Sequence, residues 1–272
     1  MNNALAGIPV KRTGQIINKD TRICAMVYAP PKIGKTTMAA TMHEFCMKEY
    51  GRPALFVACE QSDGGGVSAI QSADAPYVQP TDVQQLEGIL RALKTDTEYA
   101  AVIVDNLTDV VYNLVKPFAL KFPAREGIPT RSAGVPERSD YQTIGEKTRT
   151  LLNMMIELTR TDVKYRKHLI VNALREERRD SSNNIIAIGP DLPGALAQAG
   201  PAVFELVATI ETKFIVVPSK NDPKVNTREK VYNFITSSDG VKLAGDRYNV
   251  FPAVGPANWV QLMEEYWKPK YN

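Results

Sequence analysis

The chain has 272 residues, of which 33 are lysine or arginine and 30 are aspartate or glutamate. This length suits one large domain, or one domain with appendages, and a hydrophobic content of 44% predicts a substantial core. The near balance of charge argues against a protein that is basic all over and coats nucleic acid, although a local basic surface stays open. The cysteines are odd in number and lack C-x-x-C spacing, so we expect neither disulfides nor a zinc site.

The N-terminal segment lacks the long apolar core of a signal peptide. No segment approaches the ~20 apolar residues that cross a bilayer. We therefore expect a soluble, cytoplasmic protein that does not engage a membrane. We divide it into an N-terminal arm (1–20), a core (21–255) and a C-terminal helix or tail (256–272).

From residue 23 onward, apolar runs alternate with stretches of helical periodicity. Near-continuous apolar runs are typical of parallel strands covered on both faces, and their alternation with helices predicts an α/β fold with a mostly parallel sheet flanked by helices. Two later runs predict a smaller antiparallel extension toward the C-terminus. The predicted strands are 23–28, 54–60, 76–79, 100–106, 167–174, 203–217 and 230–238, the predicted helices are 35–50, 81–94, 141–161 and 259–267, and the predicted loops are 123–139 and 175–198, the second with a hairpin as an alternative.

The stretch APPKIGKTT nearly matches the phosphate-binding motif G-x-x-x-x-G-K-[ST], and it lies between a predicted strand and a predicted helix. Ala29 replaces the first glycine, which alanine can do where the local φ is negative. In this motif the lysine reaches the phosphates and the hydroxyl residue binds Mg²⁺. We therefore predict an ATP and Mg²⁺ site made by Ala29, Pro30, Pro31, Lys32, Ile33, Gly34, Lys35, Thr36 and Thr37.

Two carboxylates follow predicted strands at the same edge of the sheet. Asp105 ends the run AAVIVD, where a Walker B aspartate holds Mg²⁺ together with Thr36. The alternative is that Asp105 caps the next helix, although Asn106 or Thr108 would also serve there. Glu60 ends the run ALFVACE and would activate the attacking water, a role typically worth ~10²–10⁴-fold in rate. The alternative for Glu60 is a solvated loop residue or cap.

The order of these motifs resembles the RecA-like core of P-loop recombinases. That resemblance implies that Glu60, in VACEQ, is the catalytic base, and that Asn172, in LIVNALREERR, senses the γ-phosphate. The pattern also resembles short phage-encoded ATPases of the single-strand annealing type, with a DLPG segment at 191–194 and an Asp-Arg pair at 246–247. The resemblance covers roughly residues 20–255. It implies an ATPase, in the cytoplasm of a bacterial host if phage-encoded, that binds single-stranded DNA and promotes annealing or strand exchange.

The same resemblance implies a homo-oligomer, either a ring or a filament, with a single-strand DNA-binding protein as a further candidate partner. In such assemblies a basic residue from the neighbouring subunit reaches the γ-phosphate, and Lys220, Arg228 and Arg247 are the candidates. Basic residues in the two predicted loops are candidates for DNA contact, with the alternative that they only keep the loops solvated. These are Lys121, Arg125, Arg131, Arg138, Arg175, Arg178 and Arg179.

Two other functions stay open. One is a nucleotide-dependent assembly protein, such as a helicase loader or packaging-associated ATPase, whose long loops contact a protein. The other is a small-molecule kinase, which needs an acceptor pocket and an arginine-rich lid; the sequence does not separate such a lid from a DNA-binding loop.

Overall fold

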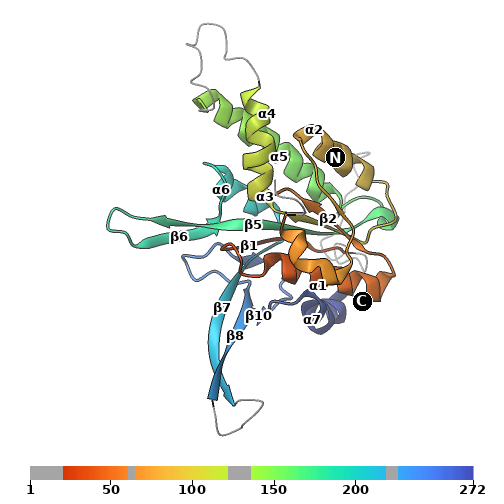
Figure 1. The fold of residues 1–272 in the computed structure, drawn as a ribbon, viewed down its shortest axis with the longest axis vertical. Coiled ribbons are helices and arrows are strands. Elements are labelled where there is room, and N and C mark those ends of the chain that lie inside the picture. Colours follow the sequence, from red (N-terminus) through yellow and green to blue (C-terminus); the bar gives the residue numbers. More distant parts are fainter. Residues whose placement is uncertain (1–20, 61–64, 122–135, 219–225, 272) are drawn as a thin grey trace, which may run out of the picture.

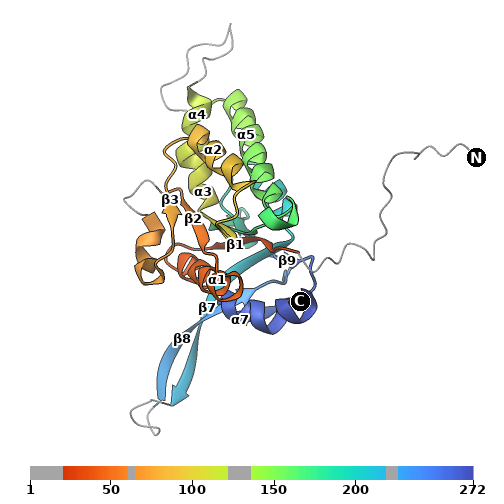
Figure 2. The same ribbon diagram turned by 90° about the vertical axis from the view of Figure 1, so that its right-hand side faces the viewer.

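The computed structural model describes residues 21–60, 65–121, 136–218 and 226–271. This part of the chain forms three layers, in which a central sheet lies between two sets of helices (Figures 1 and 2). Alternate residues of a strand point to opposite faces, and each face of the sheet carries its own buried apolar cluster. The predicted fold class is confirmed: a mostly parallel sheet is flanked by helices and continued by antiparallel strands toward the C-terminus.

The sheet order explains how distant segments meet. Its main path runs β10-β8-β7-β1-β5-β4-β2-β3, with β6 added to β5 and β9 added to β7. The pairs from β7 through β3 are parallel, so β1 lies between two strands that come much later in the chain. The strands are β1 (Cys24–Ala29), β2 (Ala54–Ala58), β3 (Tyr77–Val78), β4 (Ala101–Asp105), β5 (His168–Arg179), β6 (Ile185–Pro190), β7 (Leu206–Pro218), β8 (Asn226–Ile235), β9 (Gly245–Asp246) and β10 (Val254–Pro256).

Several helix ends follow capping rules that the sequence carries locally. Helix α1 ends at Gly51, whose φ of 60° is the left-handed conformation that glycine adopts without cost. The N-cap of α2 is Asp82, whose side chain accepts a hydrogen bond from the Gln85 N–H. The helical segments are α1 (Lys35–Tyr50), η2 (Gly65–Ala73), α2 (Val83–Leu93), α3 (Leu107–Asp109), η3 (Val110–Val115), α4 (Lys116–Leu120), α5 (Arg138–Glu157), η4 (Val163–Tyr165), α6 (Leu196–Ala199), η5 (Pro201–Val203), α7 (Trp259–Leu262), η6 (Met263–Trp267) and α8 (Lys268–Tyr271).

The two sets of helices cover opposite faces of the sheet. Helices α2, α3 and α5 pack on one face, and α1 packs on the other together with the C-terminal helices. Trp259, at the start of α7, is fully buried, and its backbone N–H donates to Thr41 Oγ1 of α1. The C-terminal segment is therefore part of the core. The N-terminal arm (1–20) lies outside the described residues.

Two β-arms project from the body (Figure 1). The strand predicted to end at residue 174 continues to Arg179 and pairs with β6, so residues 175–179 are strand and the hairpin alternative is confirmed. The charged run REERR has no apolar alternation, because both faces of this arm carry polar side chains; it therefore looks like a loop in the sequence. The second arm is formed by β7 and β8, which are paired over ten residues. Since β5 and β7 flank β1, the loop after β1 emerges between the roots of both arms.

Some other elements begin or end a few residues away from their predicted boundaries. Helix α5 begins at Arg138, inside the segment predicted as loop, because Glu137 and Asp140 form a capping box. Strand β2 ends at Ala58, so Glu60 lies two residues beyond it. The rest of the first predicted loop, residues 122–135, lies outside the described residues.

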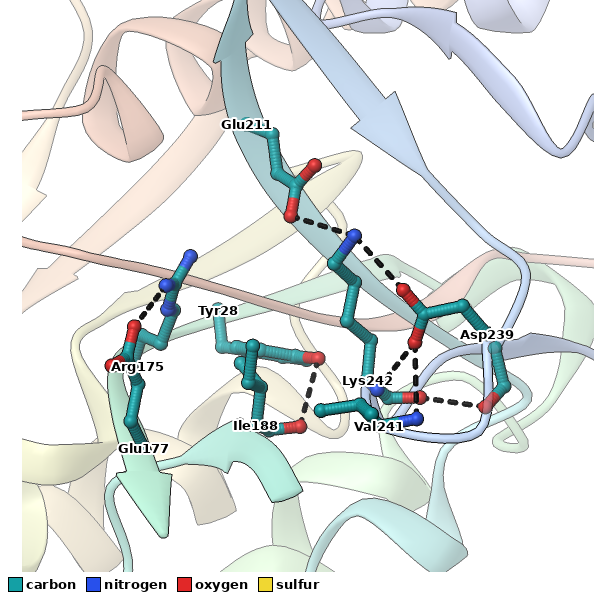
Figure 3. A network of polar contacts seen from close by, with 9 residues as sticks. Tyr28, Arg175, Glu177, Ile188, Glu211, Asp239, Val241 and Lys242 are labelled. Atoms are coloured by element: carbon teal, nitrogen blue, oxygen red, sulfur yellow. Dashed lines mark hydrogen bonds and ion pairs between the residues drawn. The ribbon is translucent and has the colours of Figure 1, made fainter. Parts of the chain in front are cut away.

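The roots of the two arms are tied together next to β1 (Figure 3). The Tyr28 hydroxyl donates to the Ile188 carbonyl of β6 at 3.3 Å. Lys242 Nζ lies 3.0 Å from Glu211 Oε1 of β7 and 3.1 Å from Asp239 Oδ2. The Ile188 N–H in turn donates to the carbonyl of Val241, the residue before Lys242, at 2.8 Å. Because Tyr28 is the residue before Ala29, these contacts connect the strand that carries the phosphate loop with both arms.

Candidate nucleotide site

The APPKIGKTT segment forms a strand–loop–helix turn. Ala29 is the last residue of β1 and is not among the residues with positive φ. Ala29 therefore does not need the positive φ that would require a glycine at this position. Gly34 has a φ of 88°, a left-handed conformation that L side chains rarely adopt, so this glycine is required by the backbone. The free N–H groups at the start of the 16-residue helix α1 point toward the loop, which suits an anion.

Lys35 is held inside the loop that it belongs to. Its ammonium donates to the carbonyls of Ala29 and Pro30, each at 3.0 Å, and the residue is only 7% exposed. Burial lowers the pKa of Lys35, and the carboxylates of Asp105 and Glu60 oppose that shift. A phosphate would replace two neutral carbonyls by anionic acceptors, which make stronger hydrogen bonds to an ammonium.

Asp105 lies between the phosphate loop and β5. Its Oδ2 accepts a 2.6 Å hydrogen bond from the Thr36 hydroxyl, and its Oδ1 accepts one of 3.1 Å from Asn172 Nδ2. The alternative that Asp105 caps the next helix is wrong. The cap of α3 is Asn106, whose side-chain oxygen accepts from the Asp109 N–H at 2.9 Å.

Gly66 marks the space between these groups. A Cβ built on Gly66 would lie 3.0 Å from Thr36 Oγ1, 3.2 Å from Asp105 Oδ2 and 3.7 Å from Glu60 Oε1. Side chains from α1, from β4 and from the segment after β2 therefore converge on one point. The absence of a side chain at Gly66 leaves the space open.

Glu60 is partly buried, and its backbone carbonyl accepts from Gln79 Nε2 at 2.7 Å. Burial raises the pKa of Glu60, and the negative charges of Asp105 and Asp109 raise it further. A higher pKa makes a carboxylate a better proton acceptor. The structure thus brings Glu60, Lys35, Thr36 and Asp105 together, as the motif order predicts.

Sequence reasoning missed two residues of this site, Gly66 and Asp109. Gly66 was visible only as part of a three-glycine loop. Asp109 lies in the first helical turn after β4, and its carboxylate accepts hydrogen bonds from Asn106 Nδ2 at 2.6 Å and Asn113 Nδ2 at 2.8 Å. Burial raises the pKa of Asp109 despite these two hydrogen bonds. The signal that could have found it was an acidic residue in the first turn after the Walker B strand.

Asn172 contacts the Walker B aspartate. It lies on β5, opposite Val27 of β1, and is 1% exposed. Its amide donates to Asp105, so in this structure it orients the Walker B carboxylate. Direct sensing of a γ-phosphate by Asn172 stays a prediction.

The oxygen donors fit a magnesium ion bound together with a nucleotide. Mg²⁺ prefers oxygen ligands and usually takes only one or two carboxylates, with phosphates and waters completing its shell. Thr36 Oγ1 and Asp105 Oδ2 supply such oxygens at the open space beside Gly66. Among the described residues, no group of three or more His, Cys, Asp or Glu side chains is placed to hold a metal ion.

The candidate DNA contacts of the second loop are the three arginines of β5, and they are paired with glutamates. Arg175 and Arg179 both form ion pairs with Glu177, and Arg178 pairs with Glu176 at 3.6 Å. With these partners the arm carries little net positive charge. Lys121 and Arg138 are exposed at the ends of α4 and α5, whereas Arg125 and Arg131 lie outside the described residues.

The candidate basic residues for a neighbouring subunit lie far apart in the fold. Arg228 is exposed on β8 of the second arm. Arg247 lies beside β9, and its side chain forms an ion pair with Glu205 at 3.7 Å. Its backbone N–H donates to the Glu205 carbonyl. Because Glu205 directly precedes β7, Arg247 lies at the edge of the sheet opposite the phosphate loop. Lys220 lies outside the described residues. None of the described helices is long and apolar enough to span a bilayer.

Comparison with known proteins identifies a family for most of the chain. A family model described as AAA domain matches residues 21–248, which include the phosphate loop, Glu60, Asp105 and Asn172. The comparison with curated proteins gives no match.

Proposed function

The chain belongs to the family described as AAA domain, an ATPase family, and on that premise we propose that it is a Mg²⁺-dependent ATPase whose nucleotide cycle controls binding to single-stranded DNA. The observation that carries the ATPase part is the convergence of Thr36, Asp105 and Glu60 on the open space at Gly66, next to the buried Lys35. Single-strand annealing or strand exchange by a homo-oligomer is the finer activity that we propose.

In this proposal each side chain has a separate task. Lys35 turns from its two loop carbonyls to the phosphate oxygens, and the N–H groups at the start of α1 bind the same anion. Thr36 and Asp105 hold Mg²⁺, which when bound neutralises phosphate charge. Asn172 fixes the orientation of the Asp105 carboxylate. Glu60 accepts the proton of the attacking water, for which its raised pKa suits it.

The DNA part of the proposal has a different support. It rests on the resemblance to short recombinase cores and on the exposed cations Lys121 and Arg138 at the ends of α4 and α5. The glutamate pairing of the β5 arginines speaks against a large role for that arm in phosphate binding.

The test measures binding of the chain to a fluorescein-labelled oligo-dT by anisotropy, with and without a non-hydrolysable ATP analogue, over a salt series. Binding through Z phosphate contacts gives log K falling with log salt at a slope of about −0.7Z. ATP hydrolysis is measured in parallel, with and without the DNA. We expect nucleotide-dependent binding and faster hydrolysis with DNA. ATP hydrolysis without any DNA binding or stimulation would support a protein partner instead.

A further inference from the structure

One side of the second arm combines exposed apolar rings with positive charge. Residues directly opposite in an antiparallel pair share a face, and the register pairs Thr212 with Tyr232, Phe214 with Lys230, and Val216 with Arg228. We define the arm face as Phe214, Val216, Arg228, Lys230 and Tyr232.

The apolar members of the arm face are far more exposed than packing residues are. Phe214 and Val216 are each 65% exposed, and Tyr232 is 40% exposed. Farther along the same ladder toward the body, Ile210 and Phe234 are buried. The apolar pattern of the core thus continues onto an arm that projects into solvent (Figure 2), where it covers nothing in the described part of the chain.

The charges of the arm are divided between its two faces. Arg228 and Lys230 lie on the arm face. Glu211 and Glu229 pair with Asn233 and Ile215, and these pairs lie on the opposite face because successive residues of a strand point to opposite faces. Among the described residues the arm face therefore contains two cations and no carboxylate. Lys230 Nζ lies 5.0 Å from the centre of the Tyr232 ring, so cation and ring already lie together. This contrasts with the other arm, where glutamates neutralise the arginines.

From this juxtaposition we infer that the arm face binds single-stranded nucleic acid, with Phe214 and Tyr232 stacking on bases and Arg228 and Lys230 on phosphates. Sequence-independent binding of single strands combines these two elements, aromatic rings that stack on bases and cations that follow the backbone. The inference rests on the proposed function and names the surface that performs the DNA binding.

The arm face begins next to the nucleotide site. A Cβ placed on Gly34 of the phosphate loop would lie 3.9 Å from Tyr232 Cε1. The ring at the root of the arm face is therefore in reach of the loop that would hold the phosphates. A strand bound along the arm face would lie beside the nucleotide site of the same chain.

The experiment compares residues of the arm that point to opposite faces. Phe214→Ala is matched by Ile215→Ala, and Arg228→Ala is matched by Lys213→Ala. Each variant of the full chain is titrated into labelled oligo-dT and into an abasic strand of the same length, after thermal unfolding has shown that it is folded. We expect Phe214→Ala to weaken oligo-dT binding by about 5- to 150-fold, the equivalent of one lost stacking contact, and to reduce the preference for oligo-dT over the abasic strand by the same factor.

In a plot of log K against log salt, we expect Arg228→Ala to make the slope shallower by about 0.7, which corresponds to the loss of one phosphate contact. The two control variants should bind as the unaltered chain does. If the unaltered chain binds oligo-dT and both arm-face variants bind it equally well, the inference is overturned while the proposed function stands. If the unaltered chain binds no DNA, both fail. If Phe214→Ala breaks up an oligomer in sedimentation while each subunit still binds DNA, the arm face is a subunit contact and the inference is overturned.

Discussion

Replacing Gly66 by alanine tests whether the space beside Thr36, Asp105 and Glu60 is the reaction site. The φ of Gly66 lies outside the left-handed region, so alanine fits the backbone there. The added methyl carbon would lie 3.0 Å from Thr36 Oγ1, whereas carbon–oxygen contacts are normally about 3.3–3.6 Å. The hydroxyl must therefore move by roughly 0.3–0.6 Å. A misplacement of about 1 Å costs on the order of 10²-fold in rate, so we expect kcat/KM for ATP to fall roughly 10- to 100-fold.

The assay is steady-state phosphate release over a Mg²⁺ titration, together with urea unfolding. The stability gain of about 0.4–1 kcal/mol that comes from restricting the unfolded chain should be offset in Gly66→Ala by the displacement of the Thr36 hydroxyl. The matched control is Gly88→Ala in α2, where a Cβ meets no atom of the described residues within 4 Å; it should show the full gain and normal turnover. Equal turnover and equal Mg²⁺ dependence in both variants would refute the reasoning.

Three further outcomes are expected. Lys35→Ala should abolish ATP binding or hydrolysis, because it removes the ammonium buried at the loop; a fluorescent ATP analogue measures the binding. Glu60→Gln should bind ATP normally and turn it over ~10²–10⁴-fold more slowly, and unchanged phosphate release would contradict its role as base. His168 is fully buried, accepts from the Ile23 N–H, and has a pKa well below its usual 6.5, chiefly through burial. Below pH 6.5 this imidazole binds a proton in the unfolded state but not in the folded state. The free energy of unfolding therefore falls as the pH falls below 6.5, by about 1.4 kcal/mol at pH 5.5. Urea unfolding at pH 7.5 and 5.5 should show this loss, and an equal loss in His168→Gln would rule His168 out as its source.

The phosphate loop and its strand were predictable because their signals are local. A continuous apolar run, the glycine-lysine sequence and a helical stretch lie next to one another in the chain. The buried strands β1, β2 and β4 have the same kind of signal, since both of their faces are covered by helices. The Glu60 and Asp105 positions followed from them, because both residues lie at or just beyond the end of such a run.

The charged arm of β5 could not be predicted in this way. Its strand is defined by pairing with β6, and its arginines and glutamates neutralise each other instead of packing on a core. The same pairing changed the expectation for Arg175, Arg178 and Arg179, which the sequence had presented as a basic loop.

The sequence by itself determined that a phosphate loop follows a buried strand and that two carboxylates follow two other strands, because hydrophobic runs and glycine positions are properties of short segments. Only the tertiary structure decided which of these residues contact one another. Inserting β5 between β1 and β4 sets Asn172 against Asp105, and the contact of η2 with α1 brings Gly66 to Thr36. Strand order and cross-strand register join residues more than 60 positions apart, and nothing in a local pattern fixes those pairings.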